Sequence, residues 1–181
     1  AAIAWLQPGN RVLQEAIERT VKERLFSMED IKFQIRALKQ NVDAGQVSEW
    51  AHRAGLGTEK NSIGQKVLCL HAGNLPLVGF QDSLGTLLSG ADYFGKLSRK
   101  DPYLLPTFLK KLKEFGLENT VEWSTILADF NDLVADTVLF AGSQQSEEPV
   151  KAELKKIKAV NEHTEFVMRT ARFSIAYITD E

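Results

Sequence analysis

Hydrophobic positions in the first third of the chain recur at the three- and four-residue spacing of amphipathic helices. Segment 11–23 has this spacing and predicts a helix with one buried face. Residues 27–30, Ser-Met-Glu-Asp, have the form of a capping box and precede a second run of helical spacing. A short helix is expected over 47–54, followed by a loop over 57–64 that is rich in Gly, Thr, Asn and Ser. The pattern therefore predicts a helical N-terminal segment over 1–56.

Beyond this loop, short apolar runs alternate with helical patterns. The expected strands are 66–71, 93–97, a short segment near Val121, 137–140, a segment near Phe166 and 173–178. The expected helices are 77–88 with Pro76 in its first turn, 101–115 with Asp101 as N-cap, 126–133, and one that ends near Ile157. Such alternation predicts an α/β domain over 65–181 with a parallel, Rossmann-like sheet.

Composition and charge narrow the class of protein. The chain has 181 residues, of which 44% are hydrophobic and 25% charged, as is typical of a globular protein with about one domain. A net charge of −2 and a pI of about 6.0 argue against a nucleic-acid or membrane-surface binder. No apolar run reaches the roughly 18 residues of a membrane span, and no signal-peptide pattern opens the chain. A single cysteine, Cys69, excludes an internal disulfide, so a reducing, cytoplasmic location is expected.

Three turns follow expected strands, at the places where a parallel sheet binds ligands. They are 71–74, 96–99 and 141–143. None matches the dinucleotide fingerprint G-x-G-x-x-G or the phosphate loop G-x-x-x-x-G-K-[ST]. Patterning alone therefore predicts an α/β domain with candidate anion-binding turns.

The residues in these turns resemble those of the acyl-CoA reductase family, the fatty-acid reductases best known from bacterial bioluminescence. This family is a branch of the aldehyde dehydrogenase superfamily. The specific part of the resemblance is the turn 74–77, Asn-Leu-Pro-Leu, followed by 96–98, Lys-Leu-Ser. Weaker matches are 87–90, 135–138, 141–143 and 172–175, and the resemblance covers residues 10–181. It implies a sheet of the aldehyde dehydrogenase type and reduction of a fatty acyl thioester to an aldehyde, with a cysteine thiolate and a nicotinamide cofactor.

The resemblance assigns a catalytic role to Asn74, whose side-chain amide would face the reacting carbonyl oxygen. An N–H donor at that point stabilises the oxyanion of a tetrahedral intermediate. The alternative is a turn asparagine that tolerates unusual backbone angles between a strand and a helix.

The resemblance also assigns the cofactor-binding residues. Lys96 matches the lysine that contacts the adenosine ribose, and Arg99 stands where NAD-preferring members often carry glutamate. A 2′-phosphate is attracted by both cations, with Ser98 as a further hydroxyl contact, so NADPH is the expected cofactor. Gly142 and Ser143 match the turn that meets the pyrophosphate at a helix N-terminus. The alternatives are a solvated basic loop and an ordinary strand-to-helix connection with Ser143 as N-cap.

The chain lacks a convincing nucleophile or general base. Cys69 lies inside an apolar strand, where free cysteine usually behaves as a small buried hydrophobe. His71 and His163 are more often structural residues at such positions, and Glu165 is out of register with the superfamily's general base. The histidines and the cysteine show no zinc spacing, so no metal site is expected.

The expected function is NADPH-dependent reduction of a fatty acyl thioester, with this chain supplying the cofactor-binding part. The catalytic domain that bears the nucleophilic cysteine is absent from this chain, so the chain alone should be inactive. The alternative is a non-catalytic nucleotide-binding or partner-binding module with the same fold. A homo-oligomer or a partner subunit is compatible with both, and neither involves nucleic acid or a membrane span.

Overall fold

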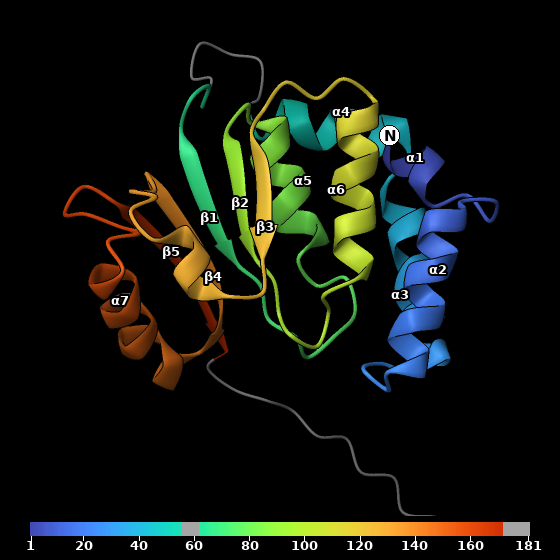
Figure 1. The fold of residues 1–181 in the computed structure, drawn as a ribbon. Helices are drawn as coiled ribbons and strands as arrows, with labels where there is room; N and C mark the ends of the chain where they lie inside the picture. The colour runs from blue at the N-terminus through green and yellow to red at the C-terminus, as the bar shows by residue number, and fades with distance from the viewer. Residues whose placement is uncertain (56–61, 172–181) are drawn as a thin grey trace, which may run out of the picture.

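A parallel sheet forms the centre of the molecule, which a computed structural model describes over residues 1–55 and 62–171 (Figure 1). Its strands are β1 (Lys66–Leu70), β2 (Asp92–Lys96), β3 (Val121–Ser124), β4 (Thr137–Ser143) and β5 (Glu165–Ala171). Their order is β3-β2-β1-β4-β5, and every neighbouring pair is parallel. This is the order of the first five strands of a Rossmann sheet, with its switch point between β1 and β4. The predicted α/β class and parallel sheet are thus confirmed.

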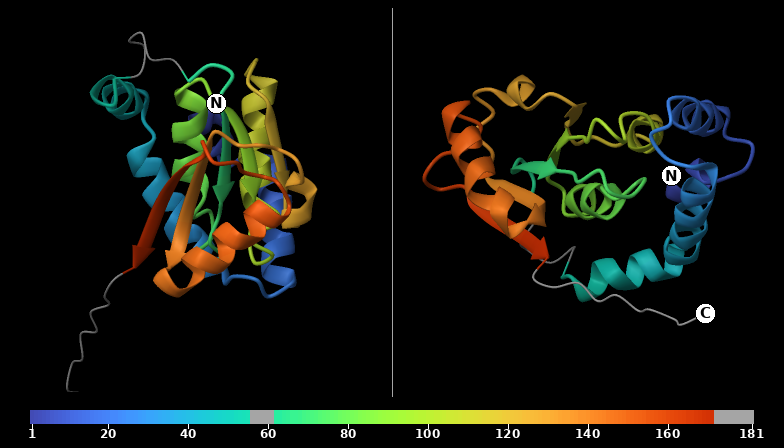
Figure 2. Two further views of the ribbon diagram at one scale, coloured as in Figure 1. Left: turned by 90° about the vertical axis from the view of Figure 1, so that its left-hand side faces the viewer. Right: turned by 90° about the horizontal axis from the view of Figure 1, so that it is seen from below.

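Helices cover both faces of the sheet (Figure 2). α5 (Phe80–Leu88) and α6 (Leu104–Glu114) pack on one face, and α7 (Glu147–Lys156) packs on the other, beside β4 and β5. The remaining helices are α1 (Ala2–Trp5), α2 (Arg11–Lys22), α3 (Met28–Asn41), α4 (Ala44–Arg53) and the short 3-10 segments η1 (Leu127–Phe130) and η2 (Gln144–Ser146). In the part of the chain that is described, no helix is long and apolar enough to cross a membrane.

β1 shows why its sequence is a continuous apolar run. Val67 and Cys69 point into the core formed with α5 and α6, whereas Leu68 and Leu70 point into the core formed with α7. A central strand of a parallel sheet is covered on both faces, so both sets of alternating side chains must be apolar.

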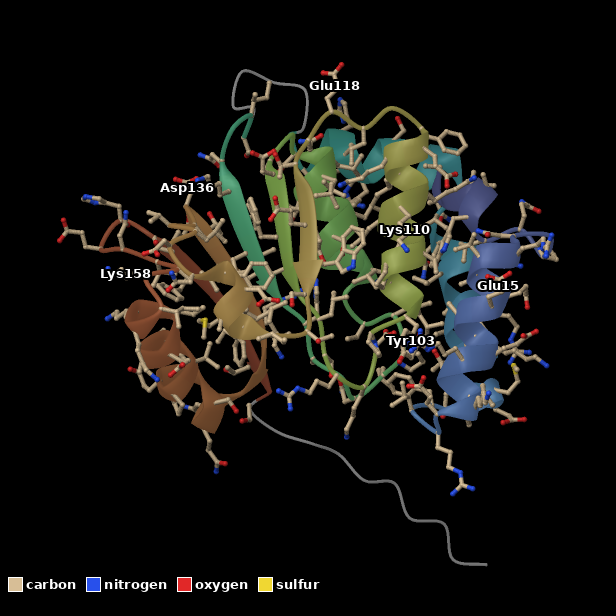
Figure 3. All side chains as sticks on the ribbon, viewed as in Figure 1. Glu15, Tyr103, Lys110, Glu118, Asp136 and Lys158 are labelled. Carbon is tan, nitrogen blue, oxygen red and sulfur yellow. The ribbon has the colours of Figure 1, made fainter. Side chains whose placement is uncertain are left out.

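The N-terminal helices share the first of these cores. Trp5 stacks on Phe80 with ring centroids 5.7 Å apart and packs against Phe108 at 5.1 Å. Its indole Nε1 donates a 2.7 Å hydrogen bond to Thr107, which satisfies the polar atom of a fully buried side chain. A second connection is visible in Figure 3, where Tyr103 lies near α2 and donates a hydrogen bond to Glu23.

The helices expected in the first 55 residues are present, and α1 is an addition to them. Ser27 and Asp30 form the predicted capping box, in which each side chain accepts from the other residue's backbone N–H. Part of the loop expected over 57–64 and the strand expected over 173–178 lie outside the described residues.

Two predicted helix starts are wrong. α5 begins at Phe80 rather than near Pro76, because Leu77 adopts a left-handed backbone with φ of 59° that interrupts helical geometry. α6 begins at Leu104, and Asp101 is not its N-cap. The carboxylate of Asp101 accepts a 2.6 Å hydrogen bond from the N–H of Leu77, and the backbone N–H of Leu104, the first residue of α6, also acts to lower its pKa.

Two further elements differ from the prediction. The segment 126–133 contains only the 3-10 segment η1, because Asp132 turns the chain with φ of 58°. β4 does not end at Phe140 but continues through Ser143, since Gly142 and Ser143 pair with Thr170 and Ala171 of β5.

Candidate functional site

The carboxyl ends of the strands, at the lower edge of the sheet in Figure 1, are hollowed by three adjoining cavities. The β2 cleft, of about 720 Å³, is lined by Gly73, Asn74, Lys96, Ser98, Arg99, Lys100, Thr125, Ile126 and Leu127. The central cavity, of about 360 Å³, lies at the switch point and is lined by Leu70, His71, Ala72, Lys96, Leu127, Phe140, Ala141, Gly142, Ser146 and Val150. The β5 cavity, of about 260 Å³, is lined by His71, Ala72, Val78, Gln81, Asp82, Ala141 and Arg169.

Four residues predicted from sequence meet in the β2 cleft. Asn74 comes from the turn after β1, and Lys96, Ser98 and Arg99 come from the end of β2 and the turn that follows it. Neighbouring parallel strands bring these turns together, because Leu70 pairs with Lys96 in register.

The two turns touch at Gly73 and Ser98. A Cβ at position 73 would overlap the Ser98 side chain, so only glycine allows the backbone of one turn to approach the other so closely. Ser98 Oγ also accepts a 3.1 Å hydrogen bond from the N–H of Lys100, which shapes the second turn. The wall of the β2 cleft therefore depends on this contact.

Replacing Gly73 by alanine is expected to lower the free energy of unfolding by about 1–3 kcal/mol, because the added methyl overlaps Ser98. In a Ser98→Gly background the same substitution should cost much less. Urea denaturation of the two single variants and the double variant measures this coupling. Gly9→Ala serves as the control, since nothing lies within 4 Å of the Cβ it adds. Equal costs of Gly73→Ala in both backgrounds would contradict the contact.

The charge of the β2 cleft is positive. Lys96, Arg99 and Lys100 line it, and no carboxylate is among its lining residues. Lys96 is half-buried, and its burial together with the neighbouring Arg99 lowers its pKa. Arg99 and Lys100 are exposed and free to meet an anion from solvent. Such a cluster favours a phosphate group.

Asn74 is exposed and also lines this cleft. Within the described residues its side-chain amide has no hydrogen-bond partner, so its donors are unengaged. Structural turn asparagines usually hydrogen-bond their own backbone. The geometry is therefore compatible with a ligand-binding amide.

The turn predicted at Gly142 and Ser143 is wrong in its local structure. Both residues belong to β4, and Ser143 makes no capping bond but contacts the Ser146 hydroxyl at 2.7 Å. The following helix, α7, carries Glu147 and Glu148 in its first turn, which makes its N-terminus unfavourable for a phosphate. Gly142 lines the central cavity, whereas Ser143 lines none of the three cavities described above.

Burial sets the protonation states of Cys69 and His71, which lie on and just after β1. Cys69 is fully buried against Thr86, and burial raises the pKa of its thiol to about 12. His71 is buried with Nε2 2.7 Å from the hydroxyl of Tyr93, and burial lowers its pKa to about 4. Cys69 is therefore a buried thiol rather than a nucleophile, as the sequence suggested, and His71 is a neutral packing residue.

The other candidate bases lie away from the site. His163 is exposed between α7 and β5, and Glu165 opens β5 at its amino end. Because the strands are parallel, Glu165 is at the edge opposite the cavities, where its neighbour on β4 is Thr137. Neither residue reaches the cavities.

Asp101 and His71 are buried, and their shifted pKa values make the free energy of unfolding depend on pH in opposite directions. Burial raises the pKa of Asp101 from 3.8 to about 6, so the fold binds this proton more tightly than the unfolded chain does. Its contribution to stability is present below pH 4 and is lost as pH rises towards 6. His71, with a pKa lowered from 6.5 to about 4, acts in the opposite direction, because its contribution is lost as pH falls from 6.5 to 4.

Asp101→Asn is therefore expected to raise the free energy of unfolding above pH 6 by about 2–3 kcal/mol, because it removes a buried carboxylate charge while keeping an acceptor for Leu77. In the wild type, the stability that His71 loses between pH 6.5 and 4 is offset by the stability that protonation of Asp101 adds. Without Asp101 this offset is absent, so the free energy of unfolding of the variant should fall as the pH is lowered through this range. Urea denaturation across this range measures both effects. Glu118→Gln, the same change at an exposed position labelled in Figure 3, should leave the profile unaltered. A profile for Asp101→Asn parallel to the wild type would contradict this account.

Two parts of the site were not predicted from sequence, namely the third wall of the β2 cleft and the β5 cavity. Thr125, Ile126 and Leu127 follow β3, a strand end that the rule for parallel sheets would have indicated. Arg169 forms an ion pair with Asp82 of α5, a contact between distant segments that no local pattern signals. Among the described residues, no group of His, Cys, Asp or Glu could hold a metal ion.

Comparison with known proteins adds no relative. No family model matches the chain, and neither the curated proteins nor the solved structures contain a match.

Proposed function

We propose that this chain is the cofactor-binding part of an NADPH-dependent reductase that converts a fatty acyl thioester to an aldehyde. The observation that carries the proposal is the β2 cleft, where Lys96, Arg99 and Lys100 meet without any carboxylate in the lining. The residue after the second strand of a Rossmann sheet is the one that selects between a ribose diol and a 2′-phosphate. Cations at this place favour the phosphate.

The lining fits NADPH in two further respects. Arg99 and Lys100 are exposed at the rim and would hold the 2′-phosphate, whereas the half-buried Lys96 would reach the ribose. Lys96 also lines the central cavity at the switch point, where dinucleotides cross a Rossmann sheet. When bound, NADPH supplies the hydride.

Asn74 supports the reductive half of the proposal. Asn74 lines the same cleft as Lys96, and its amide would donate to the carbonyl oxygen of the thioester as negative charge develops there. The nucleophilic thiolate must come from outside this chain, because its one cysteine, Cys69, is fully buried.

The test is competition for the cleft by fragments of the cofactor. NADPH fluorescence should change on binding, adenosine 2′,5′-bisphosphate should displace it, and 5′-AMP should be a far weaker competitor, because only the bisphosphate carries the group that Arg99 and Lys100 recognise. Equal competition by both fragments would refute recognition of the 2′-phosphate. Absence of NADPH binding would refute the assignment of the cleft.

The buried state of Cys69 favours a second candidate, a nucleotide-binding module without catalysis of its own. Both candidates predict NADPH binding. They differ at Asn74, which matters to turnover only if the cleft belongs to a reductase.

A further inference from the structure

An apolar pocket of about 280 Å³ lies on the outer side of α5, where α3 and α4 pack against it. Its walls are Leu38, Val42, Val47, Trp50, Phe80 and Leu84. Phe80 is fully buried and forms the floor, while Trp50 remains 43% exposed at the surface. A large aromatic side chain left this exposed beside a hollow offers apolar area to a ligand.

The polar groups of this pocket are uncharged. Asn41, Gln46 and Gln81 complete its lining, and no Lys, Arg, Asp or Glu is among the lining residues. A charged group would lose its hydration here without gaining a partner, whereas a hydrocarbon would be favoured.

α4 covers this pocket loosely. None of the α4 side chains that the structure describes is buried. The helix packs through Val47 against the core cluster that contains Phe80, and through Trp50 against Gly85 of α5. The Trp50 ring lies 3.3 Å from where a Cβ of Gly85 would be, so the glycine lets the ring lie against the α5 backbone. A helix held by so few apolar contacts can shift to admit a chain between itself and α5.

The pocket adjoins the functional edge of the sheet. Gln81, at the start of α5, lines both this pocket and the β5 cavity, which also contains His71, Asp82 and Arg169. The β5 cavity shares His71, Ala72 and Ala141 with the central cavity. A molecule in the apolar pocket would therefore extend past Gln81 towards the β5 cavity, which adjoins the central cavity.

We propose that the pocket between α4 and α5 binds the unbranched hydrocarbon chain of a fatty acyl compound, with its polar end directed past Gln81 towards the carboxyl edge of the sheet. This inference rests on the proposed function for the identity of the amphiphile as a fatty acyl compound. The location of the chain rests on the uncharged lining and on the position of Gln81.

The experiment titrates the chain with a fatty acid below its micelle concentration. Dibromostearate should quench the emission of Trp50 in a saturable manner, and Trp50→Phe should lose most of the quenching while still binding the acid in calorimetry. Affinity should rise about threefold to fourfold for each methylene from octanoate upwards until the pocket is full. Val47→Phe, which fills the pocket, should weaken binding at least about tenfold, whereas the matched Val12→Phe on exposed α2 should not.

Each other result has a distinct meaning. Quenching that does not saturate, affinity independent of chain length, or equal binding by Val47→Phe and Val12→Phe would overturn the pocket assignment. A change in molecular mass caused by Val47→Phe, without a change in acid binding, would identify the face as an interface between copies and also overturn it. NADPH binding measured on the same samples separates the proposals, because its loss with intact acid binding refutes only the proposed cofactor site.

Discussion

Under the proposed function, Arg99→Glu should abolish a preference for NADPH over NADH. The wild type is expected to bind NADPH on the order of 10²-fold more tightly, because Arg99 offers charge-assisted hydrogen bonds to a 2′-phosphate at a cleft without carboxylates. Glutamate at this position repels the phosphate and accepts hydrogen bonds from the ribose hydroxyls of NADH. The affinity for NADPH should therefore fall on the order of 10²-fold, which is the size of the expected wild-type preference, while the affinity for NADH changes little. Titration of both cofactors by fluorescence or calorimetry measures the ratio.

Two controls distinguish recognition of the 2′-phosphate by Arg99 from a general effect of protein charge on cofactor binding. They are added salt and a variant with the same change of charge at a distant position. Added salt should narrow the gap between the cofactors in the wild type, since Arg99 is exposed and its charge is screened. Lys110→Glu makes the same change of charge on the exposed surface of α6, outside the lining of the cleft, and should leave the ratio unaltered (Figure 3). Lys96→Ala should weaken both cofactors. An unchanged ratio in Arg99→Glu would show that Arg99 does not meet the 2′-phosphate.

Under the proposed function, Asn74→Ala should lower kcat for reduction of an acyl thioester by roughly 10²- to 10³-fold, the usual effect of removing one oxyanion donor. The amide is exposed in the cleft and lacks a protein partner within the described residues, so its loss should leave the fold intact. The measurement is single-turnover reduction of an acyl thioester under saturating NADPH.

Two further measurements complete the test of Asn74. They are the NADPH affinity of Asn74→Ala and the turnover of Asn74→Asp, a variant of nearly the same size. NADPH binding by Asn74→Ala should remain close to wild type, because the proposal assigns the Asn74 amide to the thioester and assigns the cofactor to Lys96, Arg99 and Lys100. Asn74→Asp keeps the size of the side chain but removes both N–H donors, so it should be at least as slow. Wild-type turnover in either variant would leave Asn74 as a turn residue and favour the non-catalytic module.

The parallel sheet was predictable from sequence because its signals are local. A buried parallel strand must be apolar on both faces, so 66–70 is readable as a run without any knowledge of its neighbours. The capping box at Ser27 is equally local, since its two hydrogen bonds join residues three positions apart.

The gathering of Asn74, Lys96, Ser98 and Arg99 in one cleft was also predictable in outline. Once the strands are known to be parallel, their following turns must lie at the same edge of the sheet. The choice of these residues, however, came from a resemblance between motifs, and the composition of the chain does not indicate it.

Tertiary contacts between distant residues decided what the sequence could not. Asp101 has the local pattern of an N-cap, but its carboxylate accepts its hydrogen bond from the N–H of the distant Leu77, which has a left-handed backbone. β4 extends through Gly142 and Ser143 because β5 pairs with it. The pocket beside Trp50 exists only where three helices meet. Sequence by itself determined the order of helices and parallel strands and the edge of the sheet at which the candidate turns lie, because those depend on hydrophobic period and chain direction. The tertiary structure alone decided the partners of single polar groups and the hollows between helices, because both depend on residues far apart in the chain.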